Sequence, residues 1–124
     1  MAKTTAKHFE IYKKECEKWI DIFGLKGWEP YFEHDIKDEN ALAQMFADIE
    51  GRTCTFFLAP DWGGNPVTNE EIDKTAFHEV LELLLARLHF LANSRSVKQG
   101  EIAEEIHHII RTFENAVFKI FKKK

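Results

Sequence analysis

The chain has 124 residues, the usual length of one domain and too short for two, so residues 1–124 are expected to fold as a single unit. Hydrophobic residues make up 44% of the chain and charged residues 31%, a balance typical of a folded globular protein, which excludes a largely disordered chain. The net charge of −4 argues against nucleic-acid binding. Two cysteines, Cys16 and Cys54, are too few for a disulfide scaffold and are interpreted as reduced core thiols.

Residues 7–23 are predicted to form the first helix, because their large apolar side chains recur at helical spacing. The apolar positions are Phe9, Tyr12, Cys16, Trp19, Ile20 and Phe23. Gly24 follows as a C-terminal stop. Residues 1–15 hold no continuous hydrophobic segment of the kind a secretory signal needs, so a cytoplasmic protein is expected.

Three segments predict strands: residues 28–34, 41–49 and 53–59. Pro30 places the first at an edge or a strand end. The second also suits a helix, because it contains alanines that favour one. Gly51 lies between the second and third segments and can supply the positive φ of a tight hairpin. We therefore expect a three-stranded antiparallel sheet.

A turn-rich segment, residues 61–66, separates the sheet from a second helix. Thr68 and Glu71 form a capping-box pattern, so this helix should start near Asn69. It is predicted to run about six turns with an apolar face made of Phe77, Val80, Leu81, Leu84, Leu85, Leu88 and Leu91. Its apolar residues are interrupted by charged ones and fall short of the ~20 apolar residues that cross a membrane, so no membrane segment is expected.

A third helix is predicted to open with a capping box at Ser96 and Gln99. The positions expected to be buried are Ile102, Ile106, Ile109, Ile110, Phe113, Val117 and Ile120. The basic residues at its end, Lys119 and Lys122 to Lys124, are interpreted as a solvated helix end. Together these elements predict an α+β fold: an N-terminal helix, a small three-stranded antiparallel sheet and two C-terminal antiparallel helices.

The second helix carries the motif His78-Glu79-Val80-Leu81-Glu82. Residues four apart share a helix face, so His78 and Glu82 present an imidazole and a carboxylate at one point, as in an HExxH metal site with the second histidine replaced. Glu79 is then placed to act as general base. Catalytic zinc needs three protein ligands, so a third must come from elsewhere in the fold.

The third helix offers two candidates for that ligand. On a helical wheel His107 lies on the flank that corresponds to the His78 flank, while Glu105 lies toward the other side. Which one reaches the pair depends on the side of the second helix on which the third helix docks. The wheel alone leaves His107 and Glu105 open.

Two stretches, Ala76–Leu85 and Glu104–Asn115, carry a family resemblance together with the order of helices and strands. The chain resembles small bacteriophage and prophage proteins regarded as minimal zincin-like metallopeptidases. That resemblance implies a zincin-like fold, His78, Glu82 and His107 as metal ligands, Glu79 as the catalytic base, and the host cytoplasm as the location. The chain lacks the second histidine of HExxH.

Three function classes follow. A zinc-dependent hydrolase acting on peptide or protein predicts an open metal position and a groove beside residues 53–59. A catalytically silent metal-binding or structural protein predicts a closed or empty site, and a phage interaction module predicts an exposed apolar patch and an oligomer. Mn²⁺, Fe²⁺ and Ni²⁺ also accept imidazole and carboxylate, so Zn²⁺ is only the first expectation. The sequence does not fix the oligomeric state.

Overall fold

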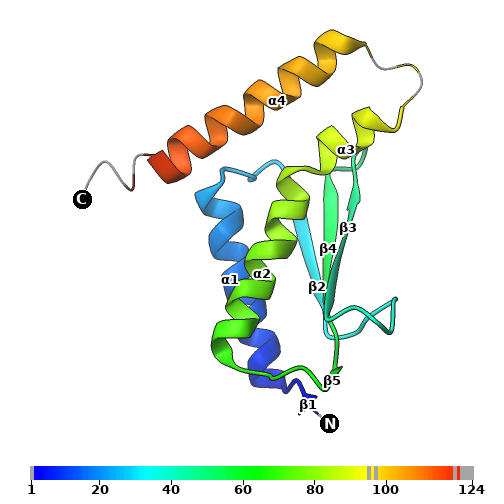
Figure 1. The fold of residues 1–124 in the computed structure, drawn as a ribbon, viewed down its shortest axis with the longest axis vertical. Coiled ribbons are helices and arrows are strands. Elements are labelled where there is room, and N and C mark those ends of the chain that lie inside the picture. Colours follow the sequence, from blue (N-terminus) through cyan, green and yellow to red (C-terminus); the bar gives the residue numbers. More distant parts are fainter. Residues whose placement is uncertain (1, 95, 97, 119, 121–124) are drawn as a thin grey trace.

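The computed structural model describes residues 2–94, 96, 98–118 and 120, and the basic residues Lys119 and Lys122 to Lys124 lie outside them (Figure 1). The elements in chain order are β1 (Ala2–Lys3), α1 (Ala6–Ile22), β2 (Glu29–Glu33), β3 (Ala43–Asp48), β4 (Thr53–Leu58), β5 (Asp61–Gly63), α2 (Asn69–Leu84), α3 (Ala86–Ala92), α4 (Gln99–Phe113) and a π-helical turn (Glu114–Phe118). The fold is α+β, as predicted. Within the described part of the chain, no helix is long and apolar enough to cross a membrane.

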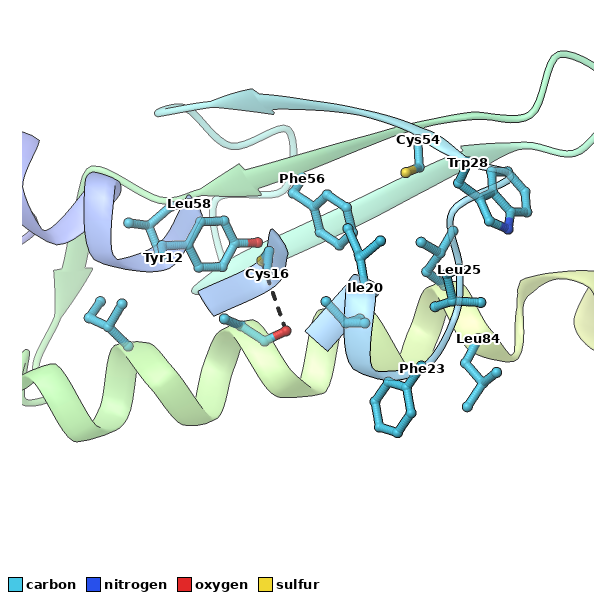
Figure 2. Packing of buried hydrophobic residues seen from close by; sticks show 14 of the residues in the cluster. Tyr12, Cys16, Ile20, Phe23, Leu25, Trp28, Cys54, Phe56, Leu58 and Leu84 are labelled. Carbon is cyan, nitrogen blue, oxygen red and sulfur yellow. Dashed lines mark hydrogen bonds between the residues drawn. The ribbon is translucent and has the colours of Figure 1, made fainter. Parts of the chain in front are cut away.

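The core lies between the sheet and the helices α1 and α2, which pack side by side (Figure 1). Figure 2 shows Tyr12 and Cys16 of α1 among the core side chains, together with Phe56 and Leu58 of β4, and all four are buried. The Tyr12 hydroxyl donates a hydrogen bond of 3.1 Å to the Phe57 carbonyl, which ties the helix to the central strand. Both cysteines of the chain are free and buried, which confirms their interpretation as core thiols.

The first helix matches its prediction closely. Thr5 caps it, because the Thr5 hydroxyl accepts a hydrogen bond from the His8 backbone N–H. Gly24 follows its end with a φ of +69°, the left-handed conformation that favours glycine. The prediction of a helix over residues 7–23 is therefore within one residue of the observed Ala6–Ile22 at each end.

The three predicted strands are present, but the sheet is mixed and the purely antiparallel prediction is wrong. The strand order is β2-β4-β3, with β2 parallel to β4 and β3 antiparallel to β4. Phe56 and Phe57 are consecutive, point to opposite faces of the sheet, and are both buried, so β4 belongs in the middle. Insertion of β4 between β2 and β3 is what makes the β2–β4 pair parallel.

The β3–β4 hairpin differs from its prediction in detail. The positive φ of +57° falls on Arg52 and not on Gly51. A side chain at Gly51 would place its Cβ 2.8 Å from an Asp48 carboxylate oxygen, and the Asp48 side chain accepts a hydrogen bond from the Gly51 N–H. Gly51 therefore does not supply the positive φ of this turn, and a Cβ there would meet only the Asp48 carboxylate.

The predicted six-turn second helix is two helices. It starts at Asn69 as expected, with the Thr68 hydroxyl accepting a hydrogen bond from the Glu71 N–H at 3.1 Å. It ends at Leu84, and one residue, Leu85, separates it from α3. The predicted capping box at Ser96 and Gln99 is also wrong, since α4 begins at Gln99 and the Glu101 carboxylate accepts a hydrogen bond from the Lys98 N–H.

The apolar face of α4 was predicted to be buried, but it points largely toward solvent. Figure 1 shows α4 crossing the C-terminal ends of α1 and α2, and it packs mainly against α3. The predicted core positions that are exposed are Ile106, Ile110, Phe113, Val117 and Ile120. The buried positions of α4 and the turn after it are Glu105 and Ala116. The helix is thus rotated away from the orientation that its apolar stripe predicts.

Candidate metal centre

His78 and Glu82 lie one turn apart on α2, as the i, i+4 spacing predicts. The His78 Nε2 and Glu82 Oε1 atoms are 3.9 Å apart, and the side chains are 70% and 59% exposed. Two ligands of a tetrahedral zinc ion, each at ~2.0 to 2.2 Å, lie about 3.4 Å apart, so a small side-chain rotation would let both bind one ion. The two side chains could therefore occupy two coordination positions of one divalent cation.

Glu79 occupies a different environment from its two neighbours. It is only 7% exposed and lines an open hollow between α2 and the residues that lead into β3, Leu42 and Ala43, with His78 beside it. Burial raises the pKa of Glu79 to about 7, while the His78 imidazole lowers the pKa and the Glu82 carboxylate raises it. A carboxyl group with such a pKa can exchange a proton near neutral pH.

The structure does not bring His107 to this pair. His107 is exposed on α4, and it lies two residues, or about 200° of helix rotation, from the buried Glu105. The face of α4 that meets the body of the protein is therefore the one that carries Glu105. Glu105 is the residue that the helical wheel left open as the alternative third ligand. Among the described residues, which include His78, Glu82 and His107, no three His, Cys, Asp or Glu side chains are grouped to hold a metal ion.

Glu105 is engaged elsewhere. Its carboxylate lies 3.2 Å from Arg87 Nε, on α3, and 3.3 Å from His108 Nδ1. It also lines a small pocket with Leu83 and Leu84, on the side of α2 away from His78. This cluster was not predicted from the sequence, although the i, i+3 spacing of Glu105 and His108 was a local signal for part of it.

Arg87→Ala should lower the free energy of unfolding by about 1 to 3 kcal/mol near pH 7.5, because it leaves a buried carboxylate with one partner in place of two. Chemical denaturation of the variant measures this loss. Arg111→Ala, which removes another exposed arginine, is the matched control and should cost less than about 0.5 kcal/mol. Equal losses in the two variants would mean that the ion pair with Glu105 contributes nothing specific.

The groove expected beside residues 53–59 lies beside β3, because β4 is the central strand and β3 is an edge. It has a volume of about 600 Å³ and runs between β3 and α3. Phe46 and Phe90 supply apolar walls, and Glu82 and His89 supply polar ones. One candidate ligand, Glu82, therefore lines this groove.

Comparison with known proteins adds no relative. No family model, no curated protein and no solved structure matches the chain. The assignment of a function therefore depends on the residues of this chain.

Proposed function

We propose that this chain is a metallopeptidase-like protein in which His78 and Glu82 bind a divalent cation and Glu79 acts as general base. One observation carries the proposal: an exposed imidazole–carboxylate pair lies on α2, and the nearly buried carboxyl group of Glu79 shares an open hollow with the imidazole of that pair, His78. A carboxyl group with a pKa of about 7 is suited to act as a general base at neutral pH, and Glu79 lies beside the two residues proposed to hold the cation.

The cation would be Zn²⁺, with Mn²⁺, Fe²⁺ and Ni²⁺ as alternatives for the same donors. When bound, it would supply Lewis acidity to the reacting group. The chain itself supplies the orientation of the pair, through the rigid turn of α2, and a proton acceptor in Glu79. The third ligand predicted at His107 does not fit the structure as it stands, and the proposal does not depend on it.

The substrate class we propose is an extended peptide or a protein segment. The edge of β3 that faces away from β4 has no strand beside it among the described residues, so its backbone groups are open to a peptide strand. The groove next to this edge combines apolar walls with Glu82. As the location we propose the host cytoplasm, in line with the resemblance to phage proteins.

A catalytically silent metal-binding protein is the second candidate. It is favoured by one observation, that the described residues assemble two of the three protein ligands that catalytic zinc uses. Such a protein would bind the cation through the same pair and would not hydrolyse peptides.

Zinc titration of protein purified without a metal-affinity tag tests the ligand pair. His78→Ala and Glu82→Gln should each weaken Zn²⁺ binding by about tenfold or more, because each removes one of two protein donors. His107→Ala is the control and should leave the affinity unchanged, since His107 lies on the outer face of α4. Unchanged affinity in His78→Ala would reject the proposed site, and weakened binding in His107→Ala would show that α4 rearranges when metal binds.

A further inference from the structure

Exposed apolar side chains of α4 and of the π-helical turn that follows it form a seam, which we define as Ile106, Ile110 and Phe113 of α4 and Val117 of the turn. In the sequence their spacing of four, three and four residues is that of the a and d positions of a heptad repeat, with Ile110 and Val117 at a; in the structure Ile106, Ile110 and Phe113 have the α-helical geometry of this repeat, and Val117 follows in the π-helical turn. Each is between 38% and 48% exposed. A surface-exposed seam with this repeat is typical of a helix that pairs with another helix.

The two flanks of the seam differ. On one flank Ile109 packs against the core and Ala116 is buried, so this flank is covered by the body of the protein itself. The other flank, in the e positions of the heptad, carries His107 and Glu114, and both are exposed. Only the e flank is therefore available to polar groups of a partner.

We propose that α4 pairs with α4 of a second copy of this chain, in antiparallel orientation, to form a two-fold symmetric dimer. In an antiparallel pair of helices the e flank of one faces the e flank of the other. In this arrangement Ile106 of one copy lies opposite Val117 of the other. His107 is then near Glu114 of the other copy, and the two-fold axis repeats the contact. A parallel pair would press this charged flank against the flank that already packs on its own body.

The contact is short, which sets its expected strength. The seam extends over twelve residues, from Ile106 to Val117, or about 17 Å of helix. An interface of this size lies at the low end of the range for specific complexes, so we expect a dissociation constant in the micromolar range. The dimer should thus appear at tens of micromolar protein and dissociate on dilution.

Sedimentation velocity of the full chain tests the proposal. The wild type should sediment as a dimer at about 100 μM, and Ile110→Lys should sediment as a monomer, because the lysine charge would be buried in the seam. Tyr31→Lys is the matched control, since Tyr31 on β2 is as exposed as Ile110 and lies outside the seam, and it should remain a dimer. A monomeric wild type, or a dimeric Ile110→Lys variant with native circular dichroism, would overturn the dimer.

A charge swap tests the orientation. Glu114→Lys should weaken the dimer by about three- to tenfold, because it sets a lysine near His107 of the other copy. The double variant His107→Glu/Glu114→Lys should return the dissociation constant close to that of the wild type. If the double variant is no tighter than the single one, the antiparallel arrangement is wrong.

Discussion

Glu79→Gln should reduce peptide hydrolysis by ~10²-fold or more while the affinity for Zn²⁺ stays the same. The amide keeps the size of the side chain but cannot accept the proton of the attacking water. Glu79 is not one of the proposed ligands, so its loss should leave the His78–Glu82 pair intact. The measurement is the rate of cleavage of a fluorogenic peptide library at saturating Zn²⁺, with metal affinity determined on the same preparations.

Two controls make this result interpretable. Glu70→Gln, at an exposed position in the first turn of α2, should leave both the rate and the affinity unchanged. Glu82→Gln should reduce the affinity itself, because a neutral amide replaces a charged ligand. Undiminished cleavage in Glu79→Gln would remove Glu79 from the mechanism, and wild-type protein without any cleavage would favour the silent metal-binding protein.

The elements that local sequence signals could predict are those whose start, end and buried face depend on neighbours in sequence. The first helix is an example, since Thr5 and Gly24 define its ends. The direction of β2 is different, because it depends on a pairing with β4, more than twenty residues away. In the sequence, the adjacent apolar residues Phe56 and Phe57 were a signal that β4 lies in the middle of the sheet, and both are buried in the structure. A prediction that relies on the alternation of apolar and polar residues does not use such a pair.

The candidate site divides in the same way. The His78–Glu82 pair is set by one turn of helix, and the structure places the two side chains together as the sequence predicts. The position of His107 depends on how α4 docks, and α4 follows the interruption at Leu85. No glycine or proline occurs between Asn69 and Ala92, so no breaker residue signals that interruption.

The rotation of α4 has a physical explanation in the residues that it buries. Glu105 forms an ion pair with Arg87 and a hydrogen bond with the His108 imidazole, and this side of the helix packs against the body. The apolar stripe is thereby turned outward, and a pattern that normally indicates a buried face becomes the exposed seam. Periodicity identifies the apolar face of a helix correctly, but it does not say whether the same chain or another chain covers that face.

Glu79→Gln should also stabilise the protein above neutral pH. The pKa of Glu79 is raised from its ordinary value of 4.5 to about 7 in the folded protein, chiefly by burial. Between these two values the folded state holds a proton that the unfolded state has lost, so the free energy of unfolding falls as the pH rises from about 4.5 to about 7. Below this window the carboxyl group is neutral in both states, and above it the cost of burying the charge is constant.

The glutamine variant lacks this titration and should escape the loss. The quantity to compare is the free energy of unfolding of the variant minus that of the wild type, with metal removed by chelator. This difference should be about 1 to 3 kcal/mol larger at pH 8 than at pH 4.5. Urea denaturation of both proteins at both pH values measures this difference, in which the titration of groups that do not interact with Glu79 cancels. An equal effect of the substitution at both pH values would mean that Glu79 ionises in the folded protein as readily as in the unfolded chain. A higher free energy of unfolding of the variant at pH 8 would mean that the wild type retains a destabilising carboxylate at the position where hydrolysis needs a base. Such a loss of stability in exchange for activity is common at catalytic sites.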